Sequence, residues 1–205
     1  MKTIHLLRHG QTAWNIERRF LGRTDIALDD VGRSQIEQLA AVFPPVSRVW
    51  SSPLRRALDT ARAVTRAQGL ADPTVDADLV EMDMGELEGM DGPTVFARYG
   101  DLLLQFRNDT ANVVLPGGET MAHAGERMWR AFARILSDVG PDETIAIVSH
   151  QMALSGLLCL ATGKGLSAYR DYTQRNTAWT TVQIDGDVLV VVSRDQAPHL
   201  DRAPG

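Results

Sequence analysis

The sequence has almost no cysteine and no long apolar run. Its single cysteine among 205 residues, Cys159, cannot form a disulfide within the chain, and its apolar setting LSGLLCLA favours a small buried side chain over a reactive thiol. No apolar stretch approaches the roughly 20 residues that a bilayer-spanning helix needs. The N-terminal segment reaches His5 and Arg8 before a signal-peptide core can form. We therefore expect a cytoplasmic protein without a membrane partner.

Positive charge is not in excess either, because 21 Lys and Arg residues stand against 26 Asp and Glu residues, a formal net charge of −5. This balance gives no general attraction for nucleic acid, so we expect no nucleic-acid partner, although positive charge can gather inside a cleft. The sequence also has no G-x-x-x-x-G-K-[ST], G-x-G-x-x-G, H-E-x-x-H or G-x-S-x-G stretch. These absences disfavour the common nucleotide loops, a typical zinc site and the usual serine-hydrolase elbow. We expect no metal and no other cofactor.

The sequence does contain an alternation of short apolar runs and helical patterns. Residues 3–7, 46–50 and 143–149 are apolar and β-branched, which predicts strands, and a helical pattern follows each within a few residues. This order predicts a mostly parallel sheet between helices. Four longer helices are predicted. They begin near Asp29 or Asp30, at Ser52 with Pro53 in the first helical position, near Glu119, and after His150, and the last of them ends near Gly163.

The C-terminal part predicts a hairpin. Residues 177–184 and 188–193 read as two strands joined by a turn at Asp185-Gly186-Asp187. The predicted fold class is therefore α/β, a three-layer sandwich with a mostly parallel sheet and an antiparallel edge hairpin. We expect one domain over residues 1–195 and a flexible tail over 196–205.

Residues 80–118 are irregular and rich in glycine, proline and methionine, with a short helix predicted between Pro93 and Arg107. Irregular segments of this kind often cover active sites, so we expect a lid or substrate loop here. The methionines Met82, Met84 and Met90 favour flexible packing in a core over an apolar substrate pocket.

Polar residues follow the predicted strands where the strands end. The first strand leads to Arg8-His9, the second to Ser51-Ser52 and then Arg55-Arg56, and the third to Ser149-His150. Ligands of open parallel sheets bind beyond the carboxyl ends of the strands. Helix N-termini and arginines both bind anions, so their convergence at this edge predicts a phosphoryl site.

Two other interpretations compete with the phosphoryl site. Taken singly, a histidine at a strand end is a satisfied polar residue and an arginine near a helix start is a solvated charge. The two histidines could also bind a metal together with Glu81 or Asp83. The metal interpretation is disfavoured, because metal-ligand spacings are absent and the neighbouring arginines would repel a cation.

Five stretches, in this order, resemble the motifs of the histidine phosphatase superfamily, its phosphoglycerate mutase-like group (branch 1). They span nearly the whole chain, which makes the resemblance very specific. The stretches are LLRHGQTAWN (6–15), SSPLRRALDTA (51–61), LVEMDMGELEG (79–89), PGGET (116–120) and VSH (148–150).

The resemblance implies a catalytic role for His9 as the nucleophile that is transiently phosphorylated. It also implies that Arg8, Arg56 and the catalytic-site residue His150 hold the phosphoryl oxygens. Of the neighbours Arg55 and Arg56, only Arg56 matches the motif, and physical reasoning alone leaves the two open.

Further site residues follow from the same motifs. Glu81 matches the catalytic proton donor of the first step and the base of the second, and Asn15 fits a polar contact to the phosphate or the leaving group. Leu21, beside Gly22, stands where many phosphatases of this group carry a polar residue. Gln151 stands where glycine or alanine is frequent. Contacts to substrate through Leu21, Gly22 and Gln151 are therefore expected to differ from those of the group.

The implied function is a phosphatase that hydrolyses small phosphate monoesters through a phosphohistidine, with a small phosphorylated metabolite as its partner. A phosphoglycerate mutase is an alternative, although such mutases usually carry a longer insertion before the P-G-G-E motif. An α-ribazole phosphatase agrees with the chain length and the SHQ segment. A non-catalytic phosphate-sensing module is a further alternative. Monomer and homodimer both stay open.

Overall fold

The computed structural model describes residues 1–186 and 188–201; Asp187 of the predicted turn and the last four residues lie outside it. Its sheet has six strands in the order β3-β2-β4-β1-β5-β6. They are β1 (Lys2–Arg8), β2 (Arg48–Ser51), β3 (Thr74–Val75), β4 (Thr144–Ser149), β5 (Trp179–Asp185) and β6 (Val188–Gln196). The pairs among β1 to β4 are parallel, whereas β5 pairs antiparallel with β1 and with β6. The mostly parallel sheet and its antiparallel edge hairpin are thereby confirmed.

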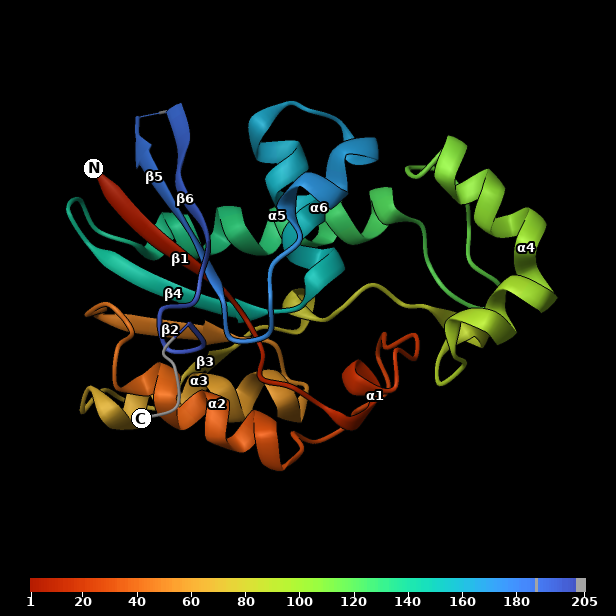
Figure 1. The fold of residues 1–205 in the computed structure, drawn as a ribbon. Coiled ribbons are helices and arrows are strands. Elements are labelled where there is room, and N and C mark those ends of the chain that lie inside the picture. Colours follow the sequence, from red (N-terminus) through yellow and green to blue (C-terminus); the bar gives the residue numbers. More distant parts are fainter. Residues whose placement is uncertain (187, 202–205) are drawn as a thin grey trace.

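Helices cover both faces of this sheet, which gives the predicted three layers (Figure 1). In the figure, α2 and α3 lie on one side, α5 and α6 on the other, and α4 stands away from the sheet. The helices are α1 (Ala13–Ile16), α2 (Asp30–Ala40), α3 (Arg55–Ala67), α4 (Gly92–Asn108), α5 (Met121–Asp138) and α6 (Gln151–Thr162). Three 3-10 helices join them: η1 (Ala77–Leu79), η2 (Gly85–Leu87) and η3 (Leu166–Tyr172). No helix within the described ranges is both long and apolar enough to cross a membrane.

The alternation of side chains along the central strands builds a core on each face. Ile4 and Leu6 of β1 belong to the larger core cluster, with residues of α5 and α6, while Leu7 belongs to a second cluster with residues of α2 and α3. Each of these three side chains is at most 1% exposed. Full burial of such a side chain contributes about 1.5–3 kcal/mol, so the sheet is held firmly from both sides.

Two predicted helix boundaries are confirmed. The side chain of Asp29 caps α2 by accepting a 2.7 Å hydrogen bond from the Gly32 N–H. At the other end of the chain, Gly163 follows α6 with a φ of 67°, a left-handed conformation that glycine adopts at low cost.

The helix start predicted at Ser52 was wrong. Ser52 still belongs to the strand end, because its N–H donates to the Val148 carbonyl at 3.0 Å. The helix begins at Arg55, after Leu54 as the N-cap residue. This delay leaves the Ser52 side chain free to face the end of the sheet.

The prediction of a flexible tail from Gln196 onward was also wrong for the residues up to 201. Ala197 and His199 are buried, and the Nε2 atom of His199 lies 2.8 Å from the Thr177 hydroxyl. The His199 ring stacks on Trp179. The tail therefore packs against the start of β5, where an apolar ring and a hydroxyl offer it partners that lie far away in sequence.

Helix α4 is longer than the short helix predicted between Pro93 and Arg107. It begins after Asp91, whose side chain accepts a hydrogen bond from the Thr94 N–H, and it is kinked at Tyr99. Of its residues only Val95 is buried. The helix therefore packs on the larger core cluster mainly through partly buried side chains, those of Tyr99, Leu102, Leu103 and Phe106.

Candidate active site

The ends of β1 and β4 bring the two predicted histidines together. Arg8 is in register with Ser149, and the His9 N–H donates to the Ser149 carbonyl at 3.2 Å. His150 follows Ser149 directly, so the rings of His9 and His150 lie with their centroids 5.1 Å apart. Both rings are almost completely buried.

The two predicted arginines are held beside these rings by backbone carbonyls. The guanidinium of Arg56, which is fully buried, donates to the carbonyls of Gly22 and Thr24 at 2.7 and 2.8 Å. The guanidinium of Arg8 donates to the Gln174 carbonyl at 2.7 Å. Burial lowers the pKa of Arg56 to about 10 and also lowers the pKa of Arg8.

One nitrogen of His9 is tied to the protein's own backbone. Its Nδ1 atom lies 2.6 Å from the Gly10 carbonyl, and because a carbonyl can only accept, Nδ1 carries the hydrogen. Burial and the charges of Arg56 and Arg8 hold the pKa of His9 well below its usual value. The ring is therefore neutral near pH 7 and keeps a lone pair on Nε2, the form that can attack phosphorus.

Several buried donors around the two rings have unused hydrogen-bonding capacity. His150 bonds the Ser52 hydroxyl through Nε2 at 2.8 Å, while its Nδ1 has no partner within the described part of the chain. The same holds for the Nε atoms of Arg8 and Arg56. Buried polar groups without partners are costly, and an oxyanion could satisfy groups of this kind.

Glu81 lies at the N-terminus of α6. Its carboxylate accepts hydrogen bonds from the N–H groups of Met82, Ala153 and Met152, at 2.8, 2.9 and 3.0 Å. Burial raises the pKa of Glu81, and these N–H donors limit the rise because they favour the charged form. The α6 terminus predicted to hold a phosphate thus holds a carboxylate. We call Arg8, His9, Arg56, Glu81 and His150 the cup.

The remaining predicted site residues surround the cup. The Oδ1 atom of Asn15 accepts from the Thr12 N–H at 3.0 Å and from the Asn176 amide at 3.3 Å. The Oε1 atom of Gln151 lies 3.3 Å from Nη1 of Arg8 and also accepts from the Gln174 N–H at 3.0 Å. The Gln151 side chain therefore positions Arg8.

Leu21 and Gly22 belong to the loop that supports Arg56. Leu21 is half-buried, and Gly22 supplies one of the two carbonyls that Arg56 binds. A Cβ atom on Gly22 would lie 2.7 Å from the Met82 carbonyl oxygen and 2.8 Å from the Met84 nitrogen, so a larger residue would push the loop away from this backbone. Gly22 is required by this close approach.

Glu88 lies within the motif LVEMDMGELEG, but no role was predicted for it. Its carboxylate accepts from the N–H groups of Arg23 and Thr24, both at 2.7 Å, and from the Thr24 hydroxyl. Since Thr24 and Gly22 present their carbonyls to Arg56, Glu88 fixes the loop that holds this guanidinium. The position of Glu88 in this motif was the sequence signal that could have indicated a role for it.

Arg127 on α5 was missed entirely. It donates to the carbonyls of Asp78, Val80 and Glu81 at 2.6, 2.9 and 3.2 Å, and to Glu119 at 2.8 Å. Burial alone raises the pKa of Glu119, but the hydrogen bonds from Arg127 and from backbone outweigh it and leave the pKa below its usual value. This buried pair fixes the segment that carries Glu81.

Asn176 is a second missed residue. Its side-chain amide donates to the His9 carbonyl at 3.0 Å, and the next N–H, of Thr177, donates to the same carbonyl at 3.2 Å. The backbone of His9 is thus held from the segment before β5. No sequence signal pointed to this contact, because it depends on how the C-terminal segment crosses the sheet end.

Comparisons with known proteins agree with this geometry. Residues 4–196 match the model of the histidine phosphatase superfamily (branch 1). The chain is 35% identical to a Cronobacter sakazakii protein named "Probable phosphoglycerate mutase GpmB", with 98% of this chain and 96% of the relative covered. Longer mycobacterial relatives are 38% identical over 78% of this chain, which covers 44% of their length.

Solved structures of phosphatases are similar over the whole fold. Mycobacterial glucosyl-3-phosphoglycerate phosphatase Rv2419c matches with a TM-score of 0.85 at 26% identity, covering 95% of this chain and 99% of that one. The α-ribazole phosphatase of Shigella flexneri matches with a TM-score of 0.83 at 25% identity, covering 95% and 96%. With its family model matched from residue 4 to residue 196, the chain belongs to the histidine phosphatase superfamily, branch 1.

Proposed function

We propose that the protein is a phosphatase that hydrolyses small phosphate monoesters through a phosphohistidine formed on His9. The main support is the tautomer of His9. Its Nδ1 hydrogen is directed to the Gly10 carbonyl, which leaves Nε2 unprotonated, and burial followed by the charges of Arg56 and Arg8 lowers its pKa. A neutral nucleophile in positive surroundings suits attack on a phosphate dianion.

In the first step, Nε2 of His9 forms a bond to phosphorus while the bond between phosphorus and the ester oxygen breaks. Glu81 gives its proton to the departing oxygen and becomes a carboxylate. Burial already raises the pKa of Glu81, and a nearby phosphate dianion would raise it further, so both favour the protonated form that this step requires.

In the second step, a water oxygen bonds to phosphorus while the bond to Nε2 breaks. The Glu81 carboxylate takes the proton of this water, which restores its acid form. His9 returns to its neutral state, and Nδ1 keeps its hydrogen throughout, donating it to the Gly10 carbonyl. The products are inorganic phosphate and the free alcohol.

Arg8, Arg56 and His150 would stabilise the charge on the transferring phosphoryl oxygens. Their buried nitrogens without partners supply the donors, and burial makes each hydrogen bond stronger than it would be in water. Gln151, Glu88 and Arg127 would act as positioning residues, because each contacts the cup or its supports.

The proposal is tested by measuring whether a labelled phosphoryl group becomes attached to the protein through a bond that is labile in acid and stable in alkali. A substrate with a labelled phosphoryl group is mixed with excess enzyme and quenched within milliseconds, and the modified residue is located by mass spectrometry. We expect label on His9 and, with His9→Ala, neither label nor phosphate release. Wild-type phosphate release no greater than that of His9→Ala would overturn the proposal, and ordinary binding of phosphate by the same protein would then favour the non-catalytic phosphate-sensing module.

A phosphoglycerate mutase is the second candidate, because a relative that matches nearly the whole chain carries that name. In a mutase the phosphoryl group returns to a second hydroxyl of the substrate instead of reaching water. Conversion of 3-phosphoglycerate to its 2-isomer faster than phosphate release would favour this candidate. α-Ribazole phosphate belongs in the same substrate panel, since a structural neighbour is a phosphatase for it.

A further inference from the structure

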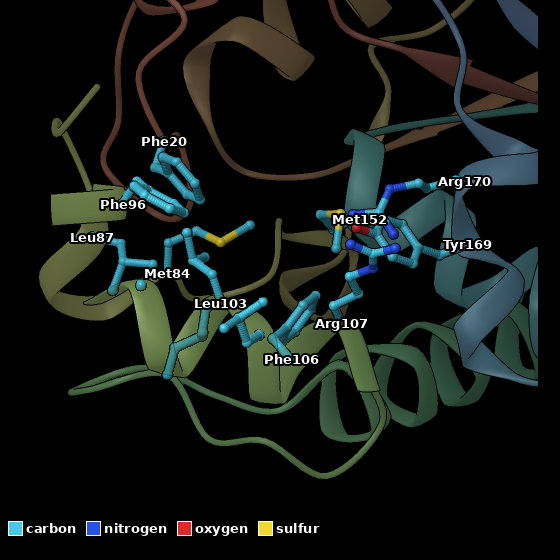
Figure 2. Close-up of a pocket in the computed structure, with 13 residues that line it drawn as sticks. Phe20, Met84, Leu87, Phe96, Leu103, Phe106, Arg107, Met152, Tyr169 and Arg170 are labelled. Atoms are coloured by element: carbon cyan, nitrogen blue, oxygen red, sulfur yellow. The ribbon is translucent and has the colours of Figure 1, made fainter. Parts of the chain in front are cut away.

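An apolar pocket of about 340 Å³ lies between α4, η3 and the start of α6 (Figure 2). Its volume falls within the range of small-molecule sites. The walls include Phe20, Phe96, Leu103 and Phe106. Met84 belongs to the larger core cluster, as expected, and also lines this pocket.

The pocket adjoins the cup at Glu81. Met152 lines the pocket, and its backbone N–H donates to the Glu81 carboxylate at 3.0 Å. Met84, which stands three positions after Glu81, lines the same space. If Glu81 protonates the departing oxygen, the rest of the leaving group has this pocket beside it.

The character of the walls selects against a sugar or another polyol. Hydroxyl groups that enter an apolar pocket lose their hydrogen bonds to water and find few replacements. The aromatic rings Phe20, Phe96 and Phe106 instead offer contact to an aromatic or branched aliphatic group. An apolar leaving group is therefore favoured.

The pocket also holds concentrated positive charge. Its lining, as far as the described residues form it, contains Arg107 from α4 and Arg170 from η3 but no acidic side chain, in a chain whose formal net charge is −5. Figure 2 shows both arginines at the end of the pocket where Met152 and Tyr169 lie. The Arg170 guanidinium rests 4.6 Å from the centre of the Tyr169 ring, which restricts its orientation.

We propose that Arg107 and Arg170 determine specificity: they bind a second oxyanion, a carboxylate or another phosphate, carried by an apolar leaving group. The preferred substrate class is then a phosphate monoester of an aromatic or branched aliphatic alcohol with an acidic group at its far end. This inference rests on the proposed phosphatase function. It adds the chemical class of the substrate.

Matched substrates test the class. Benzyl phosphate, its 3- and 4-carboxy derivatives and the corresponding carboxamides differ at the far end while their leaving oxygens stay similar. A phosphonooxymethyl-benzyl phosphate carries a phosphate there, and glycerol 1-phosphate serves as the polar comparison. We expect kcat/KM for the better carboxy or phosphate derivative to exceed that of the matching carboxamide and of glycerol 1-phosphate about tenfold.

Variants assign the effect to the two arginines. Arg107→Gln and Arg170→Gln should each raise KM for the anionic substrate several-fold with little change in kcat, and the double variant should abolish the preference over the carboxamide. Both variants should hydrolyse plain benzyl phosphate as the wild type does. The matched control is Arg130→Gln, at an exposed position of α5 outside this pocket. It should leave kcat and KM unchanged for both substrates.

The outcomes separate this inference from the proposed function. If all the esters are hydrolysed in a His9-dependent way but the anionic derivatives have no advantage, or keep it in the double variant, the specificity proposal is wrong and the phosphatase stands. If no ester in the panel is hydrolysed, the phosphatase proposal fails first. A preference for glycerol 1-phosphate over the benzyl esters would refute the apolar wall as the selecting feature.

Discussion

The cup and helix α4 are built in opposite ways, although the pocket that α4 lines lies beside the cup. Among the cup residues, His9, Arg56, Glu81 and His150 are at most 4% exposed, and hydrogen bonds from several segments fix them. In α4 only Val95 is buried, and Phe96 on the pocket wall is 68% exposed.

The two regions are built differently because phosphoryl transfer and leaving-group recognition need different degrees of positional precision. Phosphoryl transfer depends on donors held at fixed positions, which dense cross-bracing provides. Recognition of a leaving group depends on shape and can be made by a segment with few buried contacts, which opens locally at low free energy. We therefore expect changes in the sheet body and the cup to cost stability or rate, and changes in α4 to alter substrate preference.

The largest effect expected is on stability. Phe132→Ala in α5 removes a ring that is 1% exposed within the core and should lower the free energy of unfolding by about 3–5 kcal/mol. Phe96→Ala in α4 should cost less than about 1 kcal/mol, because its ring is mostly exposed. Urea denaturation of both variants measures the difference. Equal losses would show that α4 is part of the stable body.

The next effect is on rate, at two neighbouring arginines. Arg56→Ala should lower kcat/KM by about 10²–10³, the loss typical of one well-placed donor to a transition state. Arg55→Ala removes an exposed ion pair with Asp25 and should stay within about threefold of wild type. Steady-state kinetics with one monoester, together with circular dichroism to verify folding, compares them. A larger loss at Arg55 than at Arg56 would contradict the assignment of the motif arginine.

Glu81→Gln should show an effect that depends on the leaving group. A glutamine cannot give a proton to the departing oxygen, so kcat/KM for an alkyl phosphate should fall about a hundredfold. For 4-nitrophenyl phosphate, whose leaving group needs no proton, the first step should be nearly unaffected. Burst kinetics isolates this step. Equal losses of the first step for both esters would argue for a purely structural role of Glu81.

The smallest effect concerns pH and His5 in β1. Burial lowers the pKa of His5 to about 4, whereas in the unfolded chain it stays near 6.5. Its contribution to stability is therefore complete above pH 6.5 and is lost as pH falls from 6.5 toward 4. His5→Gln should reduce the loss of unfolding free energy between pH 7 and pH 5 by about 1–2 kcal/mol.

The matched control for this measurement is His123→Gln. The His123 side chain is 61% exposed and its Nδ1 atom lies 3.4 Å from the Glu119 carboxylate, so this variant measures what the loss of an exposed histidine does to the same unfolding curve. Chemical denaturation at pH 5, 6 and 7 provides the three values. An unchanged pH dependence in His5→Gln would place the sensitivity in other buried groups, such as His9 and His150, whose pKa values are also lowered by burial.

The sequence predicted where the strands that lead to the cup residues end, because strand ends depend on local patterns. An apolar run followed by Arg8-His9 or by Ser149-His150 predicts both the strand and the exposed edge where it stops. The roles of Arg127 and Asn176 could not be predicted, and that of Glu88 was indicated only by its motif, since each side chain acts through backbone groups tens of residues away. Such contacts need the tertiary arrangement.

The pocket and the C-terminal tail were missed for related reasons. Met84 has the same local sequence character as the buried Met82, and only the position of α4 and η3 opposite Met84 makes it a wall. His199 lies in a stretch of loop composition, yet a partner hydroxyl on Thr177 fixes it. Composition describes what a segment prefers alone and does not include the partners that the fold brings to it.

The hydrogen bond between Nδ1 of His9 and the carbonyl of Gly10 has a consequence for the lifetime of a phosphorylated enzyme. A neutral carbonyl steadies the positive charge of an N-phosphorylated imidazole less than a carboxylate partner would. In the proposed mechanism the phosphorus–nitrogen bond would thus remain a high-energy linkage that water cleaves readily. A side chain anchored to the adjacent peptide unit in this way is suited to passing its phosphoryl group on, and poorly suited to storing it.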